Sequence, residues 1–508
     1  MNKQNEVLSH ETLSIQPELS RDLTPVLRNR DHHRLVEDLK KLDEDLRSSG
    51  VESLAMRLAC ETSPDSGASF ARLNRRCEFA VYALRAELLR QMLGAPAFVP
   101  YSVTLSTSDL LADFCGCRTI DGIRWTSKST LQRASTFFDQ AQLRRLNVAL
   151  VELLGGRDGD APLGLERAED LSVCLIDSTC LEANIHFPVD WVLLKDVALT
   201  LLKALQLIRK EGLRHRMPYE AEKFIRQMNR LCIEMTHSRR KKGAEKMRKK
   251  VLRKMKKLLL RIRDHARRHR DLLEARQEDT RYSTAQAARI LARIDEKLEL
   301  LPQVIEQAHE RIIGARKVDN ADKILSAHEP DIDVIVRGKA GSQVEFGNEL
   351  FLAESWGGLI VDYQLYEREA PSEGEKMRES VERIEAMDLP GKLSHVVTDR
   401  GFDGKNHEAF LAERGIGSMI CPKDPARLQQ RLDEEPLFGQ MQTRRGGTEA
   451  RMAVFKNHTG SRVWRAKGFE HRARAVGWSV LSHNLQWIAR RAREEQDGKR
   501  QQAPPKSA

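Results

Sequence analysis

The chain has 508 residues, of which 40% are hydrophobic and 31% charged, and its formal net charge is +11. This composition excludes a disordered or collagen-like protein, and the length suffices for two to four domains. The N-terminus lacks an apolar segment behind a basic start, and no stretch reaches the roughly 18 uninterrupted apolar residues that span a bilayer. We therefore expect a cytoplasmic protein without a membrane segment.

Residues 1–150 are predicted to form a helical N-terminal region. Amphipathic patterns of helical period cover 32–46 and 72–92. Of the eight cysteines only Cys115 and Cys117 lie close together, with one residue between them. Zinc sites usually need two cysteine pairs with wider spacing, so we expect reduced, partly buried thiols.

Two consecutive helices are predicted within 108–138, and Ser127 is a good N-cap for the second. A helix, a connector and a capped helix are typical of a helix-turn-helix, whose second helix enters the major groove of DNA. The residues that would then contact base edges are Lys128, Ser129, Gln132 and Arg133. Because the connector is longer than the usual turn, an ordinary helical hairpin is the alternative.

A buried strand is predicted at 171–177, where a nearly continuous apolar run ends on Asp177. More than a hundred residues without strand signals follow. Within them, heptad patterns at 252–266 and 287–312 predict an antiparallel helical hairpin. We assign 193–320 to a helical insertion.

The insertion contains the excess positive charge of the chain. Residues 239–270 hold 17 of the 85 Lys and Arg residues and two of the 74 acidic residues. This segment carries +15, and the remainder of the chain carries −4. Concentrated basic charge is typical of a nucleic-acid partner, although a solvated helix face is an equal alternative. We expect the hairpin to grip DNA or a second protomer.

Strand patterns return after the insertion, at 343–354, 358–367, 393–399 and 417–422, with helical patterns at 373–387, 405–414 and 445–458. Without the insertion, this order of elements is that of the ribonuclease H-like fold. The predicted fold class is therefore α/β: a ribonuclease H-like core at 171–192 and 332–490, interrupted by a long helical insertion and preceded by an all-α region. The end of the chain, 495–508, is predicted to be a disordered tail.

In this predicted topology, the positions of three carboxylate side chains would bring them close together. Asp177 and Asp399 end two strands, and Glu449 lies on the helix after the last strand. Carboxylates this close repel unless hard cations neutralise them. Two Mg²⁺ ions, or Mn²⁺ in their place, would activate a water or a 3′-hydroxyl for attack on a phosphodiester.

The sequences around these carboxylates resemble the DDE transposases of bacterial insertion sequences. The stretch DSTCLEANIHFPVDWVLLKD, which starts at Asp177, is similar to the first block of that family, and TDRGFDGKNHEAFL around Asp399 to the second. The third family signature is Y-x2-R-x3-E-x6-K. At those spacings this chain has Gln442, Arg445, Glu449 and Lys456, so a glutamine stands in place of the tyrosine.

The resemblance implies a transposase that cuts DNA at the element's ends and joins them to target DNA. It implies Asp177, Asp399 and Glu449 as catalytic residues and metal ligands. Its partners would be terminal inverted repeats and target DNA, held by a homodimer in a synaptic complex, with the protein associated with the nucleoid. The residues expected to contact DNA are Arg400, Arg445, Lys456, Lys128, Arg133, Lys249, Lys250, Arg253, Lys254, Lys256 and Lys257.

The alternative function is a catalytically inactive, transposase-derived protein that binds DNA sequence-specifically. The presence of all three carboxylates argues against it, because a protein that no longer cuts has no need of them. A basic coiled-coil scaffold is also disfavoured, since it leaves the strand-rich residues 332–421 unexplained.

Overall fold

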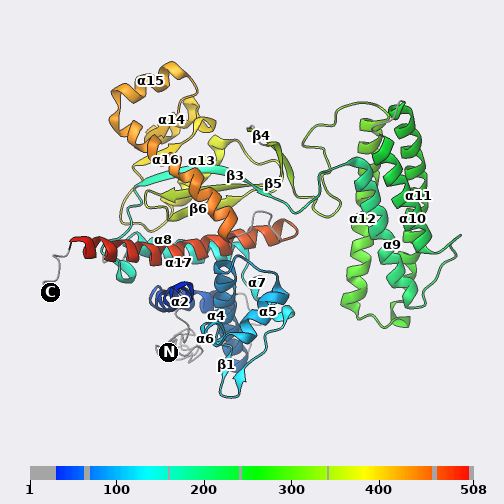
Figure 1. Ribbon diagram of the computed structural model, residues 1–508, viewed down its shortest axis with the longest axis horizontal. Helices are drawn as coiled ribbons and strands as arrows, with labels where there is room; N and C mark the ends of the chain where they lie inside the picture. Colours follow the sequence, from blue (N-terminus) through cyan, green and yellow to red (C-terminus); the bar gives the residue numbers. More distant parts are fainter. Residues whose placement is uncertain are drawn as a thin grey trace. The chain divides into compact units, whose positions relative to one another are not determined.

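The computed structural model describes residues 30–61, 69–157, 161–238, 243–339, 342–459 and 466–502. The chain divides into a larger unit, Met1–Glu182 with Asn348–Ala508, and a smaller unit, Ala183–Gly347. Figure 1 labels most of the elements of both. In the described part of the chain, none of the helices is long and apolar enough to cross a bilayer.

The N-terminal part of the larger unit is mainly helical. A short hairpin of β1 (Arg118–Thr119) and β2 (Gly122–Ile123) stands where a plain connector was expected, so the predicted all-α character is wrong here. Its turn residues are Ile120 and Asp121, and Gly122 directly after them has φ +117°, a conformation that favours glycine. The helices are α2 (Arg30–Ser48), α3 (Val51–Glu61), α4 (Phe70–Met92), α5 (Phe98–Thr107), α6 (Asp109–Phe114), α7 (Lys128–Ser135) and α8 (Gln140–Leu154).

A mixed sheet forms the centre of the larger unit. Its strands are β3 (Val173–Glu182), β5 (Ser342–Ser355), β6 (Ile360–Leu365), β7 (His395–Thr398) and β8 (Gly417–Ile420). The order is β5-β3-β7-β8, with β6 paired antiparallel to β5. β3 runs parallel to β7, and β7 runs parallel to β8.

The strand that carries Asp177 is longer than predicted. β3 continues to Glu182, so Asp177 lies within the strand and not at its end. The paired register with β7 covers only Val173–Leu175, whereas β5 lies along the other edge of β3. Pairing with β5 supports the part of β3 that follows Asp177. The apolar pattern, which ends at Asp177, could not reveal this part.

Side chains alternate between the two faces of this sheet. Leu175, Val397 and Met419 face one side and pack with Phe438 and Met441 of α16 (Pro436–Val454). Residues of opposite parity join the core that includes helix α13 (Glu373–Glu385). α16 packs across β3, β7 and β8 (Figure 1). The remaining helices near the sheet are α14 (Lys405–Glu413) and α15 (Pro425–Glu434).

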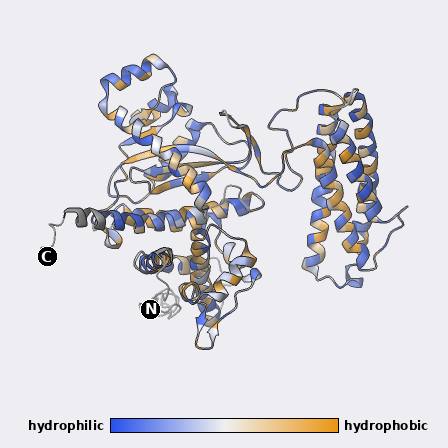
Figure 2. Cartoon of the chain, in the orientation of Figure 1, coloured by the Kyte–Doolittle hydropathy of each residue, from blue (hydrophilic) through white to orange (hydrophobic). Residues whose placement is uncertain are grey.

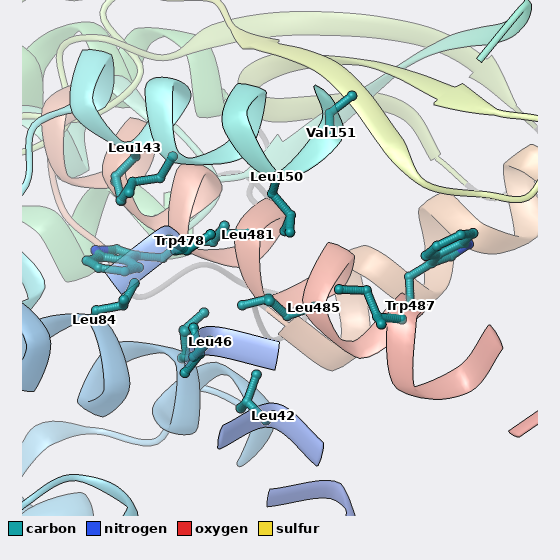
Figure 3. Close-up of a cluster of buried hydrophobic side chains, with 14 of the residues drawn as sticks. Leu42, Leu46, Leu84, Leu143, Leu150, Val151, Trp478, Leu481, Leu485 and Trp487 are labelled. Atoms are coloured by element: carbon teal, nitrogen blue, oxygen red, sulfur yellow. The ribbon is translucent and has the colours of Figure 1, made fainter. Parts of the chain in front are cut away.

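Helix α17 (Phe469–Gln502) joins the N-terminal helices to the sheet. Figure 3 shows Trp478, Leu481 and Leu485 of α17 in one buried cluster with side chains of α2, α4 and α8, among them Leu84 and Leu150. The helix also includes 495–502, which the sequence assigned to a disordered tail; the tail residues 503–508 lie outside the described residues.

The smaller unit contains a bundle of α9 (Asp190–Lys210), α10 (Ala221–Ser238), α11 (Ala244–Ala275) and α12 (Thr284–Ile312). α11 and α12 are the predicted heptad segments, and α9 packs against α10, α11 and α12. Leu252, Ile262 and Ile294 are among the buried residues of its core. In Figure 2, hydrophobic and hydrophilic residues interleave along these helices, as in amphipathic helices that share one core. The unit also contains β4 (Asp333–Lys339), antiparallel to the start of β5.

Asn484 of α17 is expected to be a stability determinant of the larger unit. Its Oδ1 accepts from the Ile360 backbone N–H at 2.9 Å, and its Nδ2 donates to the Ile360 carbonyl at 2.8 Å. Asn484→Leu leaves both groups of the sheet edge buried and unpaired, and should lower the free energy of unfolding by about 3 kcal/mol. Chemical denaturation measures this. The exposed Glu494→Ala on the same helix is the control, and a loss below about 1 kcal/mol for Asn484→Leu would contradict the prediction.

Candidate active site

Asp177 and Asp399 lie side by side on the sheet although they are far apart in the sequence. The parallel register of β3 and β7 pairs Val173 with His395 and Leu175 with Val397. The pairing ends there, and Asp177 and Asp399 each lie two residues further along the chain, close enough for the Asp399 carboxylate to raise the pKa of Asp177. Both have the parity of Leu175 and Val397, so they face α16.

Each aspartate is held by backbone hydrogen bonds. Oδ1 of Asp177 accepts from the N–H of Ser178, and Oδ1 of Asp399 accepts from the N–H of Gly401, both at 2.8 Å. Asp399 directly follows β7 and caps the short 3-10 helix Arg400–Phe402. In each carboxylate, the backbone therefore fixes one oxygen, Oδ1, and the second oxygen, Oδ2, is left for another partner.

The electrostatics of Asp177 reflect this neighbourhood. The pKa of Asp177 is raised to about 6, chiefly by burial; the nearby Asp399 and Glu449 carboxylates also raise it, whereas the Ser178 N–H and Arg445 lower it. The fold thus brings all three predicted carboxylates within electrostatic range, together with Arg445. Ionisation of Asp177 therefore costs free energy in the free protein, and a bound cation would reduce this cost.

Helix α16 supplies Arg445 and Glu449. Arg445 lies four residues before Glu449, and its Nη1 is 3.9 Å from Glu449 Oε1. The Glu449 side chain is 64% exposed and that of Arg445 17%. Nη1 of Arg445 is buried and has no hydrogen-bond partner within the described parts of the chain. A buried guanidinium N–H normally bonds an acceptor, and a phosphate oxygen would satisfy it.

Lys456 reaches the same face of the sheet from beyond the end of α16. It lies in the π-helical turn Phe455–Thr459, and its Nζ donates to Oγ1 of Thr179 at 3.3 Å. Thr179 is two residues after Asp177 on β3, hence on the same face. The geometry therefore brings Asp177, Asp399, Arg445, Glu449 and Lys456 to one face of the sheet.

A second anchor of α16 was not anticipated from the sequence. Glu354 at the end of β5 is buried and accepts from Thr448 Oγ1 at 2.6 Å and from Arg451 Nε at 2.7 Å. These residues flank Glu449, so they hold its part of the helix against the sheet. Glu354 and Thr448 lie 94 residues apart in the sequence, so no local pattern indicated this pairing.

A buried ionic network lies on the opposite side of β3. Ser178 Oγ donates to Glu373 Oε2 at 2.8 Å, and Lys376 Nζ donates to Glu373 Oε1 at 3.1 Å. Lys376, whose side chain is 2% exposed, also pairs with Glu349 at 2.7 Å. Burial raises the pKa of Glu349. The network thus supports the residue next to Asp177, and the sequence showed only a charged helix there.

The donor chemistry of the site fits a hard divalent cation, because carboxylate oxygens are the ligands that such ions prefer. The raised pKa of Asp177 is a further observation that a cation would relieve. Among the residues that the structure describes, no three His, Cys, Asp or Glu side chains form a ready metal-binding group. The exposed Glu449 would have to turn towards the aspartates to complete one.

The other residues of the larger unit that were predicted to contact DNA lie at two places. Arg400 is exposed directly after Asp399. Lys128 and Gln132 line a cavity of about 470 Å³ together with Lys467, His471 and Arg474, whereas Arg133 stacks 5.7 Å from the ring centre of Phe79. Cys115 and Cys117 are buried free thiols, and burial raises the pKa of both.

The predicted basic residues of the insertion all lie on α11. Lys250, Arg253, Lys254 and Lys257 are exposed. Lys249 instead pairs with Glu245 at 2.6 Å, and Lys256 lies 3.1 Å from Nδ1 of His309 on α12. The four exposed residues Lys250, Arg253, Lys254 and Lys257 therefore form a row of positive charge along one side of the helix, the α11 ridge. Lys249 and Lys256 instead contact side chains of the bundle.

Asp177→Asn should stabilise the metal-free protein at alkaline pH. The folded pKa of Asp177 is raised from 3.8 to about 6, so the cost of ionising it is absent below pH 4 and fully present above pH 6. The neutral substitution should raise the free energy of unfolding by about 2–3 kcal/mol at pH 8 and leave it unchanged near pH 4. Thermal unfolding in EDTA across this range tests it, with the exposed Asp388→Asn as control. Equal effects at both pH values would refute it.

Comparison with known proteins identifies a family for the C-terminal part of the chain. Residues 354–485 match the family described as the transposase DDE domain, a segment that contains Asp399, Gln442, Arg445, Glu449 and Lys456. No curated protein and no solved structure matches the chain. The transposase DDE domain implies a ribonuclease H-like fold, which agrees with the mixed sheet. Residues 354–485 of this chain are therefore similar to the transposase DDE domain.

Proposed function

We propose that the chain is the transposase of an insertion sequence, which cleaves DNA at the element's ends and transfers the 3′ ends to target DNA. One observation carries this proposal: Asp177 of β3 lies close to Asp399, which directly follows the parallel strand β7, and α16 brings Arg445 and Glu449 near them. The match to the transposase DDE domain supports it. The proposed partners are terminal inverted repeats and target DNA, bound by a homodimer.

The residues divide the chemistry between them. Asp177, Asp399 and Glu449 would hold Mg²⁺ or Mn²⁺, which when bound supplies an activated oxygen nucleophile and stabilises the leaving oxygen. Arg445 and Lys456 lie on the same face of the sheet as the carboxylates and would bind nonbridging phosphate oxygens. Hydrolysis then breaks the bond between phosphorus and the 3′ oxygen, and the freed 3′-hydroxyl attacks a phosphodiester of the target.

DNA contacts away from the cut are proposed for two further surfaces. Lys128 and Arg133 of α7 would contact the ends of the element, as expected for a recognition helix. The exposed cations of α11 would bind phosphates independently of sequence, because a helix rises about 1.5 Å per residue and so presents a long row of charge. Occupation of the α11 ridge by a second protomer is the other outcome of the binding test below.

Cleavage is the first test of the proposal. Purified protein with Mg²⁺ should nick DNA that carries the inverted repeats flanking the gene, and EDTA should abolish nicking. Asp399→Ala should reduce the rate at least about a thousandfold, since one of the carboxylates that bind the metal is removed. Gel analysis of labelled ends measures this, and Asp388→Ala is the control. Specific binding without any nicking would instead support the inactive DNA-binding protein.

The α11 ridge is tested by the salt dependence of binding. Replacing Lys250, Arg253, Lys254 and Lys257 by Ala should weaken DNA binding about equally for all sequences. The plot of log affinity against log salt should become shallower by about 0.9 for each phosphate that is no longer neutralised. Fluorescence anisotropy measures both quantities. Lys256→Gln, which faces α12, is the matched control. An unchanged slope together with dissociation of the dimer in sedimentation would assign the ridge to protein association.

A further inference from the structure

Gln442 occupies the position at which the resembling family signature has a tyrosine, and it makes three contacts at the site. Its Nε2 donates to the carbonyl of Met419 at 2.6 Å and to that of Thr398 at 3.3 Å. Its Oε1 accepts from Arg445 Nε at 3.3 Å. One side chain therefore joins the ends of β8 and β7 to the arginine that faces Glu449.

The location of these contacts gives them their significance. Thr398 is buried and is the residue directly before Asp399, and its carbonyl also accepts from the N–H of Cys421 at 3.2 Å. Gln442 therefore forms a hydrogen bond to the backbone directly before Asp399. Arg445 is one turn further along α16, and Glu449 is one turn beyond that.

A primary amide suits this place for a chemical reason. It donates through nitrogen to two carbonyls while its oxygen accepts from a guanidinium N–H, and it carries no charge. A phenol has a single O–H donor and would not satisfy two carbonyls at once. A carboxylate would repel both carbonyls at neutral pH. The contacts therefore depend on the residue type that this chain has in place of the family's tyrosine.

We propose that Gln442 is a positioning residue of the cleavage reaction. It sets the register of α16 on the ends of β7 and β8, so that the Arg445 guanidinium is held near the aspartates and Glu449 lies where it can turn towards them. The second anchor at Glu354 holds the distal part of the helix, and Gln442 holds the part before Arg445. This inference rests on the proposed function, because the reaction it serves is DNA cleavage.

The test uses two substitutions in the full-length protein. Gln442→Met keeps the length of the side chain and removes all three hydrogen bonds. Gln442→Glu keeps the acceptor for Arg445, cannot donate when ionised, and regains a donor when protonated. Thr443→Ala is the control, because Thr443 is the exposed neighbour and bonds only within its own helix.

Gln442→Met should lower kcat for Mg²⁺-dependent cleavage about tenfold to a hundredfold, with a much smaller change in KM, because misplacement affects the transition state more than ground-state binding. Gln442→Glu should be equally impaired at pH 8. Its rate relative to wild type at the same pH should recover several-fold towards pH 5.5. Comparing the two proteins at each pH removes the pH dependence that they have in common.

Two outcomes overturn the inference. A Gln442→Met protein with wild-type kcat shows that the contacts do not position the site. An equal loss in both variants without recovery at low pH shows that the residue only supports folding, and the Gln442→Glu ratio decides this even if Gln442→Met does not fold. Absence of cleavage by the wild type is a different failure: it removes the proposed function and the inference with it.

Discussion

The parallel pairing of β3 with β7 is the constraint on which the site depends. The two strands come from parts of the chain separated by the whole smaller unit, yet their register sets Asp177 beside Asp399. A slip of one residue would turn the carboxylate of one strand to the face of α13, away from α16. The apolar contacts of Leu175 and Val397 with α16 are thus what keep two distant carboxylates on a common face.

The site combines charges that repel one another with cations that do not fully compensate them. Asp177 is desolvated next to two other carboxylates, and Arg445 offsets only part of the cost. The same low-polarity surroundings strengthen the attraction of these carboxylates for a metal ion and of Arg445 for phosphate. An arrangement that is unfavourable in the free protein is suited to a bound, highly charged substrate.

Local patterns in the sequence were sufficient for much of this architecture. Apolar alternation located the strands around Leu352 and Val397, and heptads located α11 and α12. The spacing of Arg445 and Glu449 placed them on one face of a helix, and Lys456 reaches the same side of the sheet from the π-helical turn after α16. All these patterns are local, because each depends on residues that are only a few positions apart in the sequence.

Features that depend on tertiary contacts were not predictable. β3 continues past Asp177 through polar residues because β5 borders it, and α16 begins at Pro436, earlier than expected, because Phe438 and Met441 are buried. The contacts of Gln442 and Glu354 join residues from different strands and a helix. The N-terminal helices join the sheet through α17 and through Arg144 of α8, which bonds Asp362 of β6, and no local pattern indicated these partners.

The position of α17 also has a consequence for how the protein is made. The apolar sides of α2, α4 and α8 share their core with Trp478 and Leu481, which the ribosome reaches more than three hundred residues after α8. At ordinary rates of translation this leaves those surfaces uncovered for on the order of tens of seconds. The helical bundle of the smaller unit has its own core and can fold during that interval. Nascent chains of this protein should therefore be most dependent on chaperones at their N-terminal helices, until the last helix is synthesised.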